Sequence, residues 1–141
     1  MIEVDILRVC EIENAAHVSP WTPGIFKDCL RVNYLCRLME VNQDLLGYGI
    51  LNIAAGEAHL FNICINPDFQ RKGYGRKLLY HLLDLARDQK ANSIFLEVRP
   101  SNRAAVELYL DTGFVEVSVR KDYYPASEGR REDAIIYARD L

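Results

Sequence analysis

The sequence contains no apolar run that approaches the ~20 residues of a membrane-spanning helix, and its first residues are acidic rather than basic. Neither a secretory signal nor a membrane segment is therefore expected, and the predicted location is the cytosol. Internal repeats and low-complexity segments are also absent. We expect a single domain, residues 1–141, with a core large enough to fold unaided.

Cysteine is sparse and basic charge is not in excess. The four cysteines, Cys10, Cys29, Cys36 and Cys64, include no C-x-x-C pair and have apolar neighbours. Disulfides and zinc sites need clustered ligands, so we expect buried free thiols and no metal site. The 17 Lys+Arg against 20 Asp+Glu give a net charge of -3. This balance argues against nucleic acid as the partner and leaves room for a basic one.

Two helices are predicted at the start of the chain. The second should run from Pro23 to about Leu30, with Thr22 as N-cap and Pro23 at the first helical position. The first begins almost immediately, because apolar residues recur there at near-helical spacing. Its apolar side holds Ile6, Val9, Cys10 and Ala16, and its opposite side is assigned Glu11, Glu13 and Asn14.

Three apolar runs and a helix predict the centre of a sheet. Residues 34–41 and 45–55, separated by a polar turn, should form an antiparallel hairpin. Residues 58–65 are too apolar on both sides for a strand with one face in water, which places them mid-sheet. A helix with an apolar stripe through residues 78–86 separates them from a buried strand at 93–98. Strand, helix and strand in this order imply a parallel crossover.

The last third of the chain predicts a helix and two strands. Ser101 or Asn102 should cap the helix, which ends near Asp111 before Gly113, a left-handed C-cap residue. The strands are predicted at residues 114–120 and 134–139. The intervening residues, 121–131, read as a long connection of the kind that often carries function.

Two glycines lie where a strand becomes a helix, in the stretch from Asn66 to Leu79. Gly73 and Gly75 let the backbone turn with little side-chain bulk. The free amides at the start of the following helix then face outward, and the helix dipole favours negative charge. The stretch predicts an anion site that fits a pyrophosphate; the alternative is a glycine turn with a solvated basic face.

The segment Gln70-Arg71-Lys72-Gly73-Tyr74-Gly75 resembles the acetyl-CoA motif Q/R-x-x-G-x-G/A of the GNAT superfamily of N-acetyltransferases. A second motif of that superfamily is matched at the expected distance by Leu96–Arg99, Asn102, Ala105, Leu108, Tyr109, Gly113 and Phe114. Further matches at residues 61–63, 122–125 and 132–134 make nearly the whole chain similar to the bacterial ribosomal-protein-alanine N-acetyltransferases.

This resemblance implies an α/β GNAT fold, a mixed twisted sheet of about six to seven strands with splayed central parallel strands and four helices. The family's short strand before the first helix has no matching pattern here, so we expect it to be missing or vestigial. The family loop G-R-E-D-A corresponds to residues 129–134 and is one residue longer. That loop borders the acceptor site.

The resemblance also implies acetyl-CoA as co-substrate. Its diphosphate would be held by the backbone amides of Arg71, Lys72, Gly73, Tyr74, Gly75 and Arg76. The side chains of Arg71, Lys72 and Arg76 would add positive charge. The pantetheine arm would lie along Ile63, Cys64 and Ile65, and Asn102 either touches CoA or only caps its helix. Packing is favoured for the Cys64 thiol, because a catalytic thiol needs a base and the sequence places no histidine beside it.

Two residues are assigned chemistry by the same resemblance. Glu97 would be the general base, acting through water, since an uncompensated carboxylate in an apolar strand is costly; the alternative is a pair with Arg99. Tyr109 would be the general acid for the CoA thiolate, or else a core aromatic. A phenol of pKa ~10 protonates a thiolate of pKa ~8.5 over a modest uphill gap.

The acceptor is weighed by the pKa of its amine. An α-amine of pKa ~7.8 needs about 1.1 kcal/mol to be neutral at pH 7, against about 4.6 kcal/mol for a lysine at ~10.4. This agrees with direct attack by the N-terminal Ala of a protein, through a tetrahedral intermediate, and the resemblance implies a small-subunit ribosomal protein. Acetylation of lysine side chains or small amines, or a non-catalytic acetyl-CoA-binding module, are the alternatives. No oligomeric state is predicted.

Three aromatic residues, Trp21, Tyr123 and Tyr124, are candidate walls for the acceptor, or ordinary packing residues. Acidic residues such as Glu132 and Asp133 are candidates for attracting a basic peptide. The three histidines are far apart in the derived order and are expected at the surface or satisfied. They are His17, His59 and His81.

Overall fold

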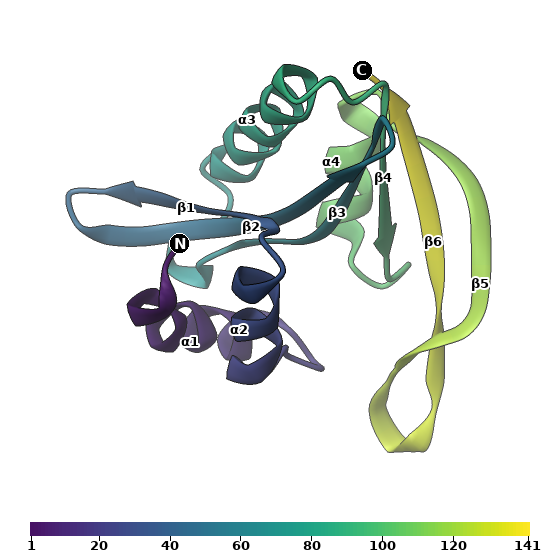
Figure 1. Cartoon of the computed structure of the whole chain (residues 1–141). Helices are drawn as coiled ribbons and strands as arrows, with labels where there is room; N and C mark the ends of the chain where they lie inside the picture. Colours follow the sequence, from purple (N-terminus) through teal and green to yellow (C-terminus); the bar gives the residue numbers. More distant parts are fainter.

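Four α-helices cover the two faces of a six-stranded mixed sheet in the computed structural model, which describes all 141 residues (Figure 1). The helices are α1 (Ile6–Ala16), α2 (Pro23–Arg31), α3 (Tyr74–Asp88) and α4 (Arg103–Asp111). The strands are β1 (Leu35–Val41), β2 (Asp44–Ala54), β3 (Glu57–Ile65), β4 (Ser93–Val98), β5 (Val115–Pro125) and β6 (Arg131–Asp140). None of the helices has the length and apolar character that crossing a bilayer requires.

The strand order is β1-β2-β3-β4-β6-β5, and every neighbouring pair is antiparallel except β3 and β4. The parallel pair confirms the strand-helix-strand unit predicted around α3 and the central place of β3. The residues ahead of α1 form a short 3-10 turn, Glu3–Asp5, and the first strand that the structure contains is β1.

The two parallel strands, β3 and β4, pair over only part of their length and then separate. Residues 57–60 of β3 pair with residues 93–96 of β4, and the pairing ends there. Phe61 is skipped in the register with β2, where Leu51 faces Leu60 and Ile50 faces Asn62. This bulge coincides with the point of parting, because an extra residue bends a strand and increases its twist. The predicted splay is confirmed, and beyond Phe61 the edge of β3 that faces β4 has no strand partner.

Two apolar clusters hold the helices to the sheet. On one face, α3 and α4 pack on the strands around Leu79, Leu82 and Ile94, each fully buried. On the other face, α1 and α2 cover β1, β2 and part of β3, with Val9 and Phe26 at the centre. The α1–α2 pair does not extend over β4, β6 and β5 (Figure 1), so this end of the sheet face is left open.

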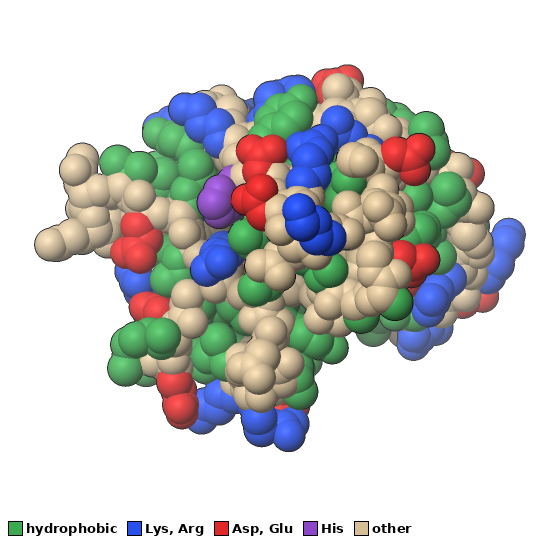
Figure 2. All heavy atoms as spheres, turned by 45° about the horizontal axis from the view of Figure 1, so that its top comes forward, with side chains coloured by type: hydrophobic (Ala, Val, Ile, Leu, Met, Phe, Trp, Pro, Cys, Tyr) green, Lys and Arg blue, Asp and Glu red, His purple; other side chains and the backbone are tan.

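Figure 2 shows the molecule with the top of Figure 1 turned toward the reader, and charged side chains of both signs are interspersed on this face. Acidic and basic groups lie next to one another there instead of forming a patch of one sign. On this face, recognition of an anion would therefore depend on particular backbone and side-chain groups.

The predicted helix boundaries are confirmed by their caps. The Thr22 hydroxyl accepts from the amide of Ile25 at 3.3 Å, and the Asn102 side chain accepts from the amide of Ala105 at 3.3 Å. Gly113 has φ of +91° after α4, in the left-handed region where a side chain is strained.

Two predictions are wrong. Glu13, assigned to the polar side of α1, is 2% exposed. Residues 121–131 do not form a long connection, because β5 continues to Pro125 and pairs again with β6, leaving residues 126–130 as the turn. The ladder resumes after a register shift at Asp122, whose φ is +50°. The shift breaks the two-residue alternation by which a strand is recognised in sequence.

Candidate active site

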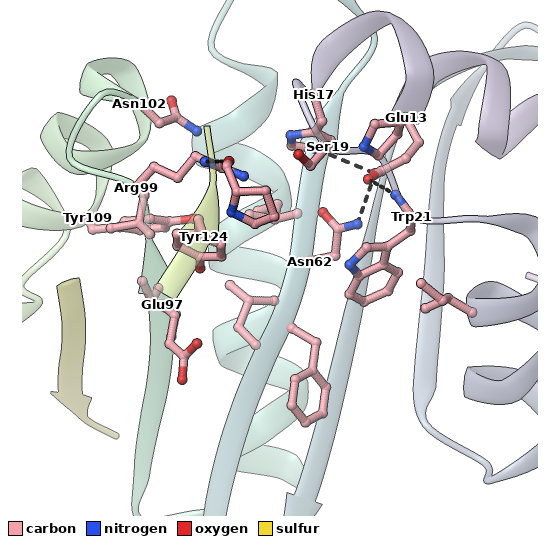
Figure 3. A pocket seen from close by; sticks show the side chains of 18 residues that line it. Glu13, His17, Ser19, Trp21, Asn62, Glu97, Arg99, Asn102, Tyr109 and Tyr124 are labelled. Carbon is pink, nitrogen blue, oxygen red and sulfur yellow. Dashed lines mark hydrogen bonds and ion pairs between the residues drawn. The ribbon is translucent and has the colours of Figure 1, made fainter. Parts of the chain in front are cut away.

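A cavity of about 380 Å³ lies where β3 and β4 part. Its two walls come from segments that are distant from one another in the sequence (Figure 3). Glu13, Trp21 and Asn62 lie on one side, and Glu97 and Tyr124 lie on the other. A second cavity of about 440 Å³ adjoins it and shares Trp21, Glu97 and Tyr124 in its lining. The two cavities form one continuous recess on the open end of the sheet face.

Glu97 faces this recess because its neighbours in β4 alternate into the core. Leu96 and Val98 are buried against the α3 and α4 side, so Glu97 points the other way. Its side chain is 30% exposed, and Oε1 lies 3.5 Å from a guanidinium nitrogen of Arg120 on β5. The alternative pairing with Arg99 is wrong, because Arg99 pairs with Glu132 at 3.3 Å.

Tyr109 is both a core aromatic and a wall of the first cavity. It is 5% exposed and packs on Phe114, with ring centroids 5.5 Å apart. Burial raises the pKa of the Tyr109 phenol above its ordinary value, because the charged form is disfavoured away from water. At neutral pH the phenol keeps its proton, so it is available as a hydrogen-bond donor, and as an acid it is weaker than a free tyrosine.

The aromatic residues predicted as acceptor walls all line the recess. Tyr124 lines both cavities, and burial first, then the Glu97 carboxylate, raises its pKa to about 12. The Arg99 guanidinium lies 4.5 Å from the centre of the Tyr124 ring. Tyr123 is 41% exposed and lines the second cavity alone. Trp21 lies opposite, in the lining of both.

The acidic residues of the β6 start are used within the protein. Glu132 accepts from the Ser101 amide and hydroxyl, each at 2.9 Å, besides its pair with Arg99. Partial burial acts to raise the pKa of Glu132, and the hydrogen bonds from Ser101 and Arg99 outweigh it and lower the pKa. Asp133 accepts from the Asp122 amide at 2.9 Å. These contacts fix the β5–β6 bulge beside Tyr123, which speaks against a free acidic patch for a basic peptide.

Glu13 is a residue of the cavity lining that the sequence reasoning missed. Its carboxylate accepts from the Tyr48 hydroxyl at 2.5 Å, the Asn62 amide nitrogen at 2.9 Å and the Trp21 backbone amide at 2.9 Å. A buried carboxylate needs such donors, because an unpaired charge away from water is costly. The signal was present: position 13 is seven residues after Ile6 and three after Cys10, in the middle of the apolar stripe of α1.

Cys64 has a histidine nearby after all. One ligand-type atom of each of Glu13, His17 and Cys64 lies within 4.8 Å of the others, which corrects the expectation that no histidine is near this thiol and that His17 stands alone. Burial raises the pKa of Cys64 to about 12, so the thiol stays protonated at neutral pH. Cys64 belongs to the buried cluster under α1 and α2, in agreement with the packing role.

The glycine turn has the geometry of an anion cradle. Arg71 and Gly73 have φ of +63° and +84°, and α3 starts at Tyr74 with no side chain capping its first amides. A Cβ at Gly73 would meet nothing within 4 Å, so the turn is open above this residue. Successive amides of this kind, at a helix start, suit a phosphate group. The residues therefore fit the diphosphate of a CoA ester.

Side chains around the turn are partly engaged with one another. A guanidinium nitrogen of Arg76 lies 3.5 Å from a carboxylate oxygen of Asp111 in an exposed pair, and the Lys72 ammonium lies 5.8 Å from the centre of the Phe69 ring. Of the three β3 residues expected along a pantetheine arm, Ile63 and Ile65 both pack on the α3 side of the sheet, and Ile63 also lines the first cavity. Asn102 caps α4 and also lines the first cavity.

A parallel strand pair that splays beside an uncapped helix start, with a carboxylate and a phenol in the adjoining recess, is the arrangement that the sequence resemblance implies for a CoA-dependent acyltransferase. The model of the acetyltransferase (GNAT) family matches residues 4–114. The chain belongs to this family and is an acetyl-CoA-dependent N-acetyltransferase.

Curated relatives agree with the family assignment. The [ribosomal protein bS18]-alanine N-acetyltransferase of Escherichia coli K12 is 41% identical over 134 residues, which span 95% of this chain and 90% of the relative. The protein of the same name from Haemophilus ducreyi is 37% identical over 138 residues, 98% of this chain and 95% of that one. The crystal structure of the ribosomal-protein-S18-alanine N-acetyltransferase from Escherichia coli, 39% identical, superimposes with a TM-score of 0.93 over 100% of this chain and 90% of that chain.

Proposed function

We propose that this enzyme acetylates the α-amino group of an N-terminal alanine on a ribosomal protein equivalent to bS18. The observation that carries this choice of acceptor is the 41% identity to a relative of that name, spread over 95% of the chain. A ribosomal acceptor would be met in the cytoplasm, and we propose that the enzyme acts there. We further propose that residues 1–141 act as one catalytic domain and that no metal takes part.

The co-substrate is assigned to the turn and the free edge of β3. The amides of residues 71–76 would hold the diphosphate, with the Arg71, Lys72 and Arg76 side chains adding positive charge. The amides of residues 63–65 that lack a β4 partner would hold the pantetheine arm. The exposed Asn102, which already caps α4, stands at the cavity to contact the same molecule.

Glu97 and Tyr109 are proposed as the proton-transfer groups. Of the two carboxylates that line the recess, Glu97 has no backbone or hydroxyl donor bound to it, whereas Glu13 accepts from the Trp21 amide and the Tyr48 hydroxyl. Glu97 is therefore free to take the proton of the acceptor ammonium, directly or through water. Tyr109, held neutral by burial, would return a proton to the departing thiolate. Trp21, Tyr123 and Tyr124 would flank the acceptor chain.

A peptide panel with mass spectrometry tests the proposal. Purified enzyme and acetyl-CoA are incubated with a basic peptide that begins with Ala, and with the same peptide beginning with Ser, Met or a pre-acetylated Ala. The expected product is a single acetyl group on the free Ala terminus, with the blocked peptide unmodified at its lysines. Failure to acetylate any Ala terminus refutes the proposed function, and modification of lysines in the blocked peptide supports side-chain acetylation instead.

A further inference from the structure

The Glu13 network joins parts of the acceptor side of the recess that are distant in sequence. The carboxylate sits on α1, and its three donors come from the segment before α2 (Trp21), from β2 (Tyr48) and from β3 (Asn62). Two of these donors, Trp21 and Asn62, line the first cavity, and Tyr48 is fully buried behind it. The Glu13 carboxylate also lies 3.4 Å from Nε2 of His17, another lining residue, so contacts of Glu13 reach the cavity through three separate residues.

A carboxylate fixes the orientation of the Asn62 amide. Because an ionised carboxylate only accepts hydrogen bonds, the Asn62 group that faces Glu13 must be its NH2. The amide oxygen then points to the other side, toward the cavity, as Figure 3 shows. An amide oxygen in that place is a hydrogen-bond acceptor, which suits an incoming amine and not an acyl oxygen.

The same carboxylate holds the wall opposite Tyr124. The bond from the Trp21 amide to Glu13 ties down the backbone of a segment that has just left α1, and the indole packs on Phe26, with ring centroids 5.3 Å apart. Phe26 in turn packs edge-on to Tyr48 at 5.8 Å. Trp21 is the only tryptophan of the chain, so its emission reports on this wall alone.

We infer that Glu13 is a positioning residue for the acceptor: it turns the Asn62 amide oxygen toward the incoming amine and holds Trp21 as the wall beside it. This inference rests on the proposed function, and Glu13 itself takes no proton from the substrate. Its effect should therefore appear in acceptor binding rather than in the chemical step.

Replacing Glu13 by Gln removes the charge but keeps the size of the side chain. The amide group of Gln offers an NH2 to one of the three donors, so the Trp21 bond is lost or Asn62 turns over. We expect KM for the Ala peptide to rise about tenfold, the scale of one hydrogen bond to a charged group, with kcat within about threefold of the native value. Trp21 emission should shift to longer wavelength. Glu11→Gln, the same change on the exposed side of α1, should alter neither quantity.

A double-mutant cycle separates positioning from stability. In an Asn62→Ala background, Glu13→Gln should add less than about threefold to KM, because contacting residues are not additive when one acts through the other. Tyr48→Phe removes the donor that faces the core, and it should lower Tm while raising KM less than Glu13→Gln does. If Glu13→Gln does not fold, Asn62→Ala alone must still raise KM, with Trp21 emission unchanged.

Three results overturn the inference: full additivity of Glu13→Gln and Asn62→Ala, a loss confined to kcat, or a KM that follows Tm across all variants. The wild-type enzyme provides the separation from the proposed function. If it acetylates no Ala peptide, the proposed function fails, while the shift of Trp21 emission in Glu13→Gln still tests the contact between the two residues.

Discussion

The role of Glu97 leads to a prediction about pH as well as rate. Glu97→Gln keeps the shape of the side chain on the open face of β4 and removes the only unsaturated carboxylate of the recess. Since a positioned general base contributes about 10² to 10⁴ in rate, kcat/KM for an Ala peptide at pH 7 should fall by about 10²-fold or more. The substitution leaves the turn at residues 71–76 and the free edge of β3 unchanged, so acetyl-CoA binding should be unchanged. Proton transfer from Tyr109 to the thiolate should also be unaffected.

The deficit should shrink as the pH rises. Without Glu97 the reaction depends on acceptor that is already neutral. For an α-amine of pKa ~7.8 the neutral fraction is about 14% at pH 7 and about 94% at pH 9, so the variant should regain about sevenfold relative to the native enzyme. Steady-state rates from pH 6 to 9.5, followed by release of free thiol, measure both effects.

Glu107→Gln, the same substitution on the exposed surface of α4, is the matched control and should behave as the native enzyme at each pH. A Glu97→Gln enzyme with native kcat/KM at pH 7 would show that Glu97 is not the base. A deficit that is equal at pH 7 and pH 9 would show that Glu97 acts on something other than the amine proton, such as the position of Arg120.

Three further predictions concern Tyr109, Gly47 and Glu132. Tyr109→Phe removes the hydroxyl, so kcat should fall about tenfold or more in steady-state kinetics. It keeps the packing on Phe114, so Tm should change by a few degrees at most in thermal unfolding. Gly47→Ala places a Cβ 2.5 Å from the Cys64 carbonyl oxygen, a backbone atom that must move, so unfolding in urea should show a loss of about 1–3 kcal/mol, whereas Gly24→Ala, with its nearest atom at 3.7 Å, should be near neutral. The pKa of Glu132 is lowered in the folded state, so its contribution to stability is present above the ordinary carboxyl range and is lost as pH falls through the folded pKa. Glu132→Gln should therefore lose stability at pH 7 and differ less from the native protein near pH 3. Unfolding measured at both pH values checks this.

Regular elements were predictable because their signals are local. Thr22, Asn102 and Gly113 mark helix ends by their own chemistry, and the apolar runs of β2, β3 and β4 mark the buried middle of the sheet. The parting of β3 from β4 followed from the family resemblance, since a single extra residue at Phe61 leaves no local pattern.

Parts of the site depended on contacts between distant residues. The pairing of Glu97 with Arg120 rather than Arg99 depends on the strand order, in which β6 lies between β4 and β5. No spacing rule in the sequence reveals that order. Glu13 was given to the polar side of α1 because charged residues are almost never fully buried unless paired, and its partners lie up to 49 positions away. The bulge at Asp122 hid the outer half of the β5–β6 hairpin in the same way.

The short contact between β3 and β4 has a mechanical consequence. Within the sheet, four residue pairs join the strands β1-β2-β3 to the strands β4-β6-β5, while one apolar cluster under α3 and α4 spans both halves. A molecule hydrogen-bonded along the free edge of β3 would serve as a removable strand, extending the ladder from residue 61 onward and bracing the two halves against each other. At about 100 times its Kd such a molecule adds about 2.7 kcal/mol to stability. The enzyme would then be most rigid with the co-substrate bound and least rigid after the product leaves. The same short contact between β3 and β4 would therefore affect both tight binding and release.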